Sequence, residues 1–357
     1  MIGDLKLNDA YADARFRLIG TQRYGYLVGG DKVAGGTSDL GDFPGGTDIL
    51  LLNYLKVPFS FIQIQNHLRK AGRLDLGEYD CVFNGVTNPD TNPKVLTAMA
   101  KVLKGYKGRV INHPAAVLKS GRDAISRRLR GIPGLHAPPA VRFTGGSRKG
   151  TEVAIEKAGV AFPAILRAAG AHLGAATLLV QRMEDLPDLK PGRDYYLISF
   201  IDYRSPDGLY RKTRFFFLGD EVVIRDQFIS DHWNVQPAAR RGFMANRPDL
   251  IEEERRLIAA GFDAFPPGVP AILEAVRSRV GLDFFGLDCG FLRNGTLVLF
   301  EANASMNFSP ASERSPFEYL HTRVELGRAG FRSLLSPHYR SRTPKVAEAA
   351  PPARVFA

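Results

Sequence analysis

The chain has 357 residues, a length that allows two or three domains at roughly 150 residues each. Apolar residues make up 45% of it and charged residues 24%, which excludes a disordered chain or a fibrous repeat. Lys and Arg outnumber Asp and Glu by 48 to 37, so the formal charge is +11 and we expect an anionic partner.

Much of this positive charge lies in one short stretch, residues 119–149. The stretch contains a single acid, Asp123, and eight basic residues: Lys119, Arg122, Arg127, Arg128, Arg130, Arg142, Arg148 and Lys149. Nucleic acid, a membrane surface or a phosphorylated small molecule could each be the anion, and charge alone does not distinguish them.

Short sequence features exclude several classes of protein. The two cysteines, Cys81 and Cys289, are too few for a disulfide scaffold and form no CxxC zinc pattern. Charges interrupt the first 20 residues, which therefore lack the apolar core of a signal peptide. The most apolar run, residues 49–55, is far shorter than the roughly 20 residues of a membrane helix. We predict a soluble, cytoplasmic protein without a membrane partner.

In chain order, the first 112 residues alternate between predicted strands and helices. A strand over 79–86 leads into the polar loop NPDTNP, a helix spans 95–108 and a short strand spans 109–112. This alternation is typical of a small α/β domain with a parallel sheet. Because ligands often bind beyond the carboxyl ends of parallel strands, Asn84 and Asn88 are substrate candidates.

From residue 162 onward, after a basic helical stretch, the chain becomes richer in strands. A strand over 162–168 precedes the glycine loop AGAHLGA, and β-rich segments follow at 195–201 and 209–223. Helices are predicted over 248–260 and 270–280. The last residues, 339–357, predict a disordered tail.

The most informative segment is GLDFFGLDCGFLRNGTLVLFEANASMNF, residues 281–308. Asn294 and Gly295 predict a hairpin with a two-residue turn. That turn pairs Leu292 with Leu297, Gly290 with Leu299 and Asp288 with Glu301. Because side chains on a strand alternate between faces, Asn303 lies on the same face as Glu301. The three polar side chains Asp288, Glu301 and Asn303 thus converge.

Two carboxylates opposite each other repel, and burial strengthens the repulsion. Apolar neighbours such as Leu287 and Phe300 predict that this end of the hairpin is covered. A divalent cation would remove the conflict, and three oxygen ligands without sulfur or imidazole suit Mg²⁺. We predict that Asp288, Glu301 and Asn303 bind Mg²⁺, with Mn²⁺ as a second candidate. The alternative is a solvated hairpin end in which the two acids merely tolerate each other or share a proton.

With this pattern, the chain resembles the ATP-grasp superfamily, in which an Asp on one strand and a Glu-x-Asn on the next hold two Mg²⁺ ions. Asp288 and the segment EAN that begins at Glu301 match that pattern. The resemblance runs from residue 79 to residue 310, and residues 211–235 resemble a poorly characterised group with an SDHW-like motif. It implies an α/β N-terminal domain over 1–112 and an α+β ATP-grasp domain over 113–338, whose two subdomains clamp ATP.

The resemblance also implies which residues bind ATP. Arg122 and Arg167 lie where the family commonly has phosphate-binding lysines, and arginine can bind phosphate with bidentate geometry. The remaining candidates are Gly170, His172 and Gly174 in the phosphate-covering loop, Phe200 and Ile201 on the adenine strand, and Asp202 for the ribose. Structural alternatives are a salt bridge for Arg167, turns for the glycines and for Asp202, and simple exposure for His172.

Cations on the segment 209–223 are candidates for phosphoryl transfer. Lys212 and Arg214 share one face of this strand, whereas Arg211 points away. Cations aimed at an acyl phosphate suit the transfer, so Arg167, Lys212 and Arg214 are the predicted catalytic residues. A solvated charged face is the alternative. Asp231, His232 and Trp233 could line an acceptor pocket, or Trp233 could be a core anchor.

The implied reaction is an ATP- and Mg²⁺-dependent carboxylate–amine ligation through an acyl phosphate. The partners would be a small-molecule or peptide carboxylate and an amine acceptor, and a homo-oligomer is compatible with the sequence. One alternative is a ligase that modifies a ribosomal precursor peptide. The other is a non-catalytic nucleic-acid binder, which is disfavoured because aromatic residues are not interleaved with the basic stretch.

Overall fold

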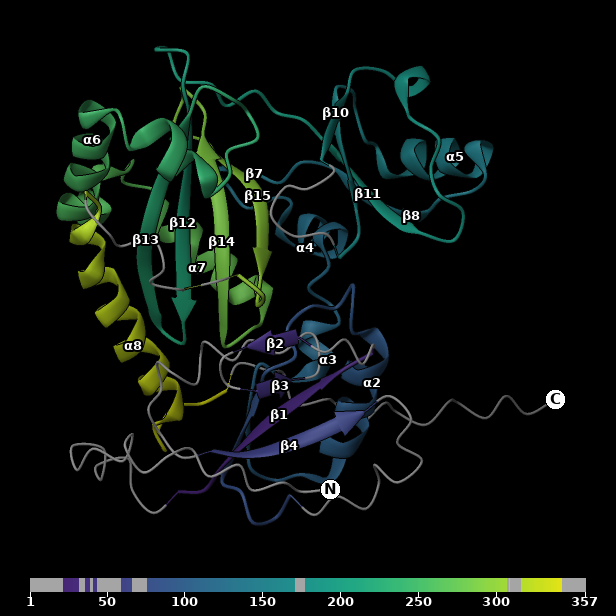
Figure 1. The fold of residues 1–357 in the computed structure, drawn as a ribbon, viewed down its shortest axis with the longest axis vertical. Coiled ribbons are helices and arrows are strands. Elements are labelled where there is room, and N and C mark those ends of the chain that lie inside the picture. The colour runs from purple at the N-terminus through teal and green to yellow at the C-terminus, as the bar shows by residue number, and fades with distance from the viewer. Residues whose placement is uncertain are drawn as a thin grey trace.

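The computed structural model describes residues 22–31, 36–38, 41–43, 59–65, 76–170, 177–306, 308 and 316–341. Figure 1 shows three sheet-bearing parts: the N-terminal part at the bottom, a four-stranded sheet at the upper right and a larger, five-stranded sheet at the upper left. Among the described helices, none has both the length and the apolar character needed to cross a membrane.

The N-terminal part has a parallel sheet in the order β4-β1-β5-β6. Its strands are β1 (Tyr24–Gly30), β4 (Phe59–Gln65), β5 (Cys81–Asn84) and β6 (Arg109–Ile111). Helix α2 (Pro93–Val102) and a 3₁₀ turn connect β5 to β6, and a separate pair is formed by β2 (Gly36–Ser38) and β3 (Gly41–Phe43). The predicted α/β class of this part is confirmed, although its strands and helix are shorter than predicted.

The second part is an antiparallel sheet in the order β10-β9-β11-β8. It follows α3 (Pro114–Val117), α4 (Arg122–Leu129) and β7 (Leu135–His136). Its elements are β8 (Ala140–Thr144), α5 (Arg148–Ala158), β9 (Ala164–Ala168), β10 (Leu178–Val180) and β11 (Asp194–Ser199). Buried side chains such as Ile155 on α5 and Leu166 on β9 give this sheet a core of its own.

The third part is a five-stranded sheet in the order β13-β12-β14-β15-β7. All its strand pairs are antiparallel except β15 with β7. The added strands are β12 (Tyr210–Leu218), β13 (Glu221–Ser230), β14 (Phe284–Phe291) and β15 (Leu297–Asn303). The helices are α6 (Pro248–Ala260), which packs on β13, α7 (Val269–Val280), and α8 (His321–Leu335), which packs on β12 and β13.

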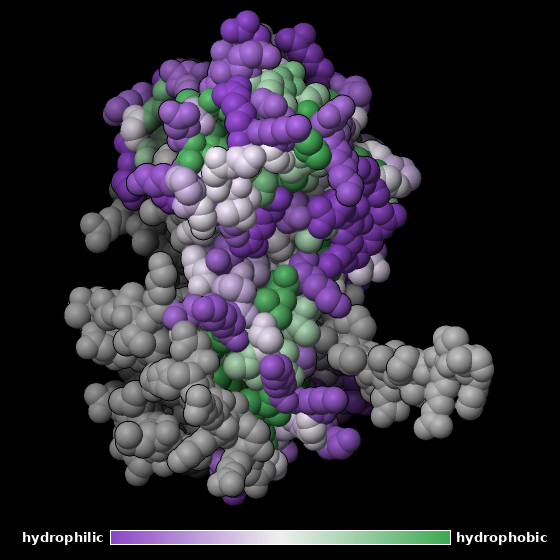
Figure 2. Space-filling model, turned by 90° about the vertical axis from the view of Figure 1, so that its right-hand side faces the viewer, coloured by the Kyte–Doolittle hydropathy of each residue, from purple (hydrophilic) through white to green (hydrophobic). Residues whose placement is uncertain are grey.

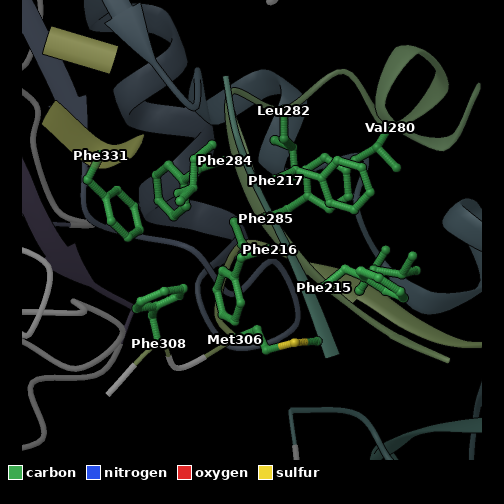
Figure 3. Close-up of a cluster of buried hydrophobic side chains, with 14 of the residues drawn as sticks. Phe215, Phe216, Phe217, Val280, Leu282, Phe284, Phe285, Met306, Phe308 and Phe331 are labelled. Carbon is green, nitrogen blue, oxygen red and sulfur yellow. The ribbon is translucent and has the colours of Figure 1, made fainter. Parts of the chain in front are cut away.

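Stacked aromatic rings fill the core of the five-stranded sheet (Figure 3). Phe217 on β12 stacks on Phe285 of β14 with ring centroids 4.3 Å apart. Phe83 of β5 stacks on Phe284 at 5.3 Å, so the same core continues into the N-terminal sheet. The N-terminal and five-stranded sheets are therefore joined by one core, whereas the four-stranded sheet has a separate one.

Asn112, between β6 and α3, locks the N-terminal sheet to the start of β14. Its Oδ1 accepts hydrogen bonds from the backbone N–H of Asp283 at 2.7 Å and of Phe284 at 3.0 Å. Its Nδ2 donates to the Phe284 carbonyl at 2.8 Å. The backbone φ of 52° is in the left-handed region, which Asn tolerates better than most residues. Asn112 thus satisfies buried backbone groups at and just before the start of β14 from the N-terminal part of the fold.

The chain after α8 also packs at this junction. The Tyr339 hydroxyl donates to Asp283 at 2.9 Å, and the Ser341 hydroxyl donates to the Val110 carbonyl at 2.8 Å. Order therefore extends at least to residue 341, into the segment predicted as a disordered tail from residue 339. The rest of that tail lies outside the described residues.

Replacing Asn112 by Ala should lower the free energy of unfolding by about 2–4 kcal/mol, because two buried N–H donors and a carbonyl lose their partner. Asn294→Ala is the matched control, since the Asn294 side chain makes an exposed hydrogen bond to the Thr296 N–H. That control should lose less than about 1 kcal/mol in the same urea titration. Equal losses of unfolding free energy in the two variants would show that the buried hydrogen bonds of Asn112 stabilise the fold no more than an exposed one.

Candidate active site

A cavity of about 460 Å³ lies between the four-stranded and five-stranded sheets. Residues of β9 and β11 line one side of it, and residues of β12 to β15 line the other. Asn88, Pro89 and Asp90, which follow β5 in the N-terminal part, also line it. Elements from all three parts of the fold therefore meet at this cavity.

The predicted hairpin forms, and Asp288 lies opposite Glu301 as predicted. The turn is longer than two residues, because Phe291 pairs with Leu297 and Gly290 pairs with Val298. The predicted pairs Leu292–Leu297 and Gly290–Leu299 are therefore wrong. A β-bulge at Phe300 adds one residue to β15 and restores the predicted register at Glu301. The longer turn shifts the strand register by one residue, and the bulge shifts it back before Glu301.

Glycines make room around Asp288 on β14. Gly286 and Gly290 lie two residues before and after it, on the same face of the strand. A Cβ at Gly290 would come within 2.6 Å of the Tyr203 ring, and one at Gly286 would overlap Met306. The pattern GLDCG thus allows large side chains that line the cavity to pack directly beside the carboxylate.

Cations on β12 hold the Asp288 carboxylate in a salt bridge, and the Asp288 side chain is only 2% exposed. Arg214 donates to both of its oxygens, at 2.7 and 2.8 Å, and Lys212 Nζ lies 3.3 Å from Oδ2. Burial alone would raise the pKa of Asp288, but the charges of Arg214 and Lys212 hold it well below its usual range. Asp288 is therefore a carboxylate at neutral pH.

A second pair of cations faces Glu301. Arg122 at the start of α4 forms a salt bridge with Glu301, across 179 positions of sequence. Burial would raise the pKa of Glu301, but the charge of Arg122 outweighs it, so this pKa is lowered. Burial and the charge of Arg122 lower the pKa of Arg167 to about 10. Arg167 on β9 would therefore gain from an additional anion nearby.

Asn303 completes the predicted metal ligands. It lies opposite Gly286 and two residues beyond Glu301, on the same face of β15. Its Oδ1 is buried with no hydrogen-bond partner among the described residues. No three His, Cys, Asp or Glu side chains in the described part of the chain form a metal-binding group, so the site depends on this amide oxygen. An oxygen-only set with one unsatisfied buried acceptor fits the chemistry of Mg²⁺.

Another β-bulge brings unpredicted charges into the cavity. Arg214 pairs with Asp226 of β13, but Phe215 pairs with Ile224, so Arg225 is the additional residue. Both Arg225 and Asp226 line the cavity, although consecutive residues of a regular strand face opposite sides. The sequence alone gives no signal for this bulge. Phe228 and Arg240 also line the cavity and were not predicted.

Apolar and aromatic side chains surround another portion of the cavity. Phe200 and Ile201, predicted to contact adenine, both line it. Trp233 also lines it and packs edge-on against Phe200 at 5.6 Å. Tyr203 and Phe300 form a second ring pair at 4.6 Å. This surface can accommodate a flat heterocycle, while the charged surface can accommodate phosphates.

Other predicted residues lie away from the cavity. Asp202 is exposed and pairs with Arg204 in the turn after β11. Asn84 is buried at the domain junction, where its side chain donates to the Asn112 carbonyl. Asp231 and His232 are exposed and outside the lining, whereas Asn88 and Gly170 belong to it. His172 and Gly174 lie outside the described residues.

Most of the basic stretch has partners within the chain. Arg142 pairs with Asp90 and Asp194, and Arg128 donates to the carbonyls of Lys119 and Val280. Similar pairs are Arg127 with Asp123 and Arg148 with Glu152. Arg122 lines the cavity, and the other seven basic residues of the stretch do not. Figure 2 shows the face of the molecule around α5, which is mainly hydrophilic.

The sequence matches no protein-family model and no curated protein. Solved structures with a similar fold include a RimK domain ATP-grasp protein from Sphaerobacter thermophilus, with a TM-score of 0.48 and 15% identity, over 88% of this chain and 99% of that one. Another is the VanG D-Ala:D-Ser ligase from Enterococcus faecalis, with a TM-score of 0.48 and 11% identity, over 89% and 99%.

A third similar structure is a carboxyaminoimidazole ribonucleotide synthase from Aspergillus clavatus complexed with ATP. Its TM-score is 0.47 at 14% identity, over 80% of this chain and 71% of that one. At such low identity the likeness concerns the fold alone.

Replacing Arg214 by Met should lower the free energy of unfolding by about 3–5 kcal/mol, since it leaves Asp288 buried beside Lys212 alone. Arg204→Met makes the same exchange in the exposed pair with Asp202 and should leave stability near that of the wild type. Urea denaturation at neutral pH measures both. An equally small loss for Arg214→Met would contradict a strong buried pair.

The effect of Arg214→Met should also depend on pH. Because the pKa of Asp288 is depressed in the folded protein, the stabilisation is fully present above the unfolded pKa of about 3.9 and is lost as the pH falls through the lower folded value. The stability difference between wild type and variant should therefore narrow below about pH 4. A difference that stays constant between pH 7 and pH 3 would show that Asp288 is not the group involved.

Proposed function

We propose that this chain is an ATP-grasp enzyme that uses ATP and Mg²⁺ to join a carboxylate to an amine through an acyl phosphate. The observation that carries the proposal is the convergence of Asp288, Glu301 and Asn303 on one cavity wall, beside buried cations. Oxygen ligands next to guanidinium groups form the combination that phosphoryl transfer from a nucleotide requires.

The charge of the cavity lining supports binding of a polyanion. Seven cationic and four acidic side chains line it: Arg122, Arg167, Lys212, Arg214, Arg225, Arg240 and Arg241, against Asp90, Asp226, Asp288 and Glu301. A site with low-dielectric walls and surplus positive charge concentrates anions such as the triphosphate of ATP. The aromatic portion around Phe200 and Trp233 would take the base.

In this proposal, Asp288, Glu301 and Asn303 would hold the metal ions, and Mg²⁺ would neutralise phosphate oxygens during transfer. Arg167 and Arg122 would bind phosphate oxygens from the side of β9 and α4. Lys212 and Arg214 would stabilise the charge that develops on the transferred group. The reaction needs no nucleophile from the protein. The substrate carboxylate would attack the γ-phosphate of ATP to give an acyl phosphate and ADP, and the amine would then displace phosphate from the acyl carbon.

Asp288→Asn and Glu301→Gln should each reduce Mg²⁺-dependent ADP release by about 10²–10³-fold, since each removes a charge that the metal site requires. ADP release is measured with pools of amino acids and peptides, and products are identified by mass analysis. Asp220→Asn, an exposed acid at the β12–β13 turn, is the matched control and should keep wild-type turnover. Full turnover in the Asp288→Asn/Glu301→Gln double variant would overturn the metal assignment.

Arg167→Met should weaken ATP binding at least about tenfold, because it removes a partly buried cation from the predicted phosphate end of the cavity. The chain has one tryptophan, Trp233, and it lines the cavity, so its fluorescence reports nucleotide binding directly. Arg148→Met, on the exposed face of α5, is the control with the same side-chain exchange. Unchanged affinity in Arg167→Met would remove Arg167 from the phosphate site.

A further inference from the structure

Asp226 on β13 has a buried oxygen without a hydrogen-bond partner among the residues that the structure describes. Its side chain lines the cavity, and the residue is only 4% exposed. The Oδ1 atom accepts no hydrogen bond from any described residue. The other oxygen lies 3.6 Å from Arg225 Nη1 and 3.8 Å from Arg240 Nη2, beyond hydrogen-bond length. A buried carboxylate oxygen in this state calls for an N–H or O–H donor from a ligand.

Arg240, which is close to Asp226, has a buried N–H donor that lacks an acceptor among the described residues. Its two terminal nitrogens donate to Glu254 at 2.7 and 2.8 Å, but its buried Nε–H has no acceptor within the described part of the chain. The guanidinium lies between the rings of Phe228 and Phe317, each 4.8 Å away. Arg240 is thus held in one orientation, and its Nη2 lies 3.8 Å from Asp226 Oδ2, so the two side chains with unsatisfied atoms are neighbours.

Within the described part of the chain, Asp226 Oδ1 lacks a donor and Arg240 Nε–H lacks an acceptor, and a single ligand that carries both complementary groups could satisfy them. A protonated amine would donate to Asp226 Oδ1, and a carboxylate on the adjacent carbon would accept from Arg240 Nε–H. We propose that this end of the cavity is a subsite for the α-amino and α-carboxylate groups of an amino acid. The inference rests on the proposed function and names the class of one of its substrates.

The sheet places this subsite at a suitable distance from the predicted metal site. Asp226, Arg214, Asp288 and Glu301 form one row across β13, β12, β14 and β15. Adjacent strands lie about 4.8 Å apart, so Asp226 is about 10 Å from Asp288 along the row. An amino acid bound at Asp226 and Arg240 would therefore lie within its own length of a phosphate bound near Asp288.

Fluorescence of Trp233 tests this subsite separately from ATP binding. Wild-type protein is titrated first with MgATP and then, with and without MgATP, with each proteinogenic L-amino acid. The amino acid that binds is compared with its des-amino acid and its decarboxylated amine. We expect each analogue to bind at least about tenfold more weakly, since each loses one charge-assisted contact.

The variant Asp226→Asn should weaken amino-acid binding at least about tenfold and leave the affinity for MgATP within a few-fold of wild type. Asp220→Asn should change neither affinity. MgATP binding and circular dichroism verify that Asp226→Asn is folded, and the analogue series needs no variant at all. Failure of MgATP alone to bind would instead count against the proposed function.

Three outcomes would overturn the subsite: no amino acid binds, the des-amino analogue binds as well as the parent, or a folded Asp226→Asn protein keeps full affinity. Any of them would mean that Asp226 does not bind the amino group of a ligand, and that water satisfies its buried oxygen instead. Selective loss of amino-acid binding in Asp226→Asn, together with weak binding of both analogues, would establish the subsite.

Discussion

The two adjacent carboxylates, the buried Asp288 and the partly buried Glu301, are the constraint on which the rest of the structure depends. Side by side on β14 and β15, they repel each other and lose hydration, so each must be compensated. Arg214 and Lys212 come from the adjacent strand β12, whereas Arg122 comes from α4. The position of α4 against β15 is therefore fixed by charge as well as by packing, and with it the entry of the chain into the four-stranded sheet.

The cations of the cavity are held in place without all being neutralised. The ring of Phe228 lies 5.5 Å from Lys212 Nζ and 5.6 Å from the Arg214 guanidinium, and it also stacks on Arg240. An aromatic face stabilises a cation without removing its charge. Carboxylates alone would have produced a neutral wall, whereas carboxylates and one aromatic ring leave a wall with surplus positive charge. This surplus is what a polyanionic ligand can use.

Local sequence predicted the main polar cluster, because the hairpin that carries Asp288, Glu301 and Asn303 is closed by a turn only a few residues away. The prediction reached the right pair through two compensating deviations, a longer turn and the bulge at Phe300. The bulge at Arg225 had no such compensation, so Asp226 was missed. Sequence clustering of charge was also misleading, since most of the basic stretch pairs with acids and carbonyls elsewhere in the fold. Contacts across long sequence separations, such as Arg122 with Glu301, are visible only in the folded chain.

The same salt bridges would couple the nucleotide and the metal ion, the two ligands of the proposed reaction. Both oxygens of Asp288 accept hydrogen bonds from Arg214, and Glu301 is bonded to Arg122. An arginine that turns toward a phosphate releases its carboxylate, which then becomes a better ligand for a cation. A cation bound to the carboxylates in turn leaves the arginine free to bind phosphate. Each ligand would thus offset the electrostatic cost of the other, so nucleotide and metal would bind to this wall cooperatively, and the buried acids would remain compensated throughout.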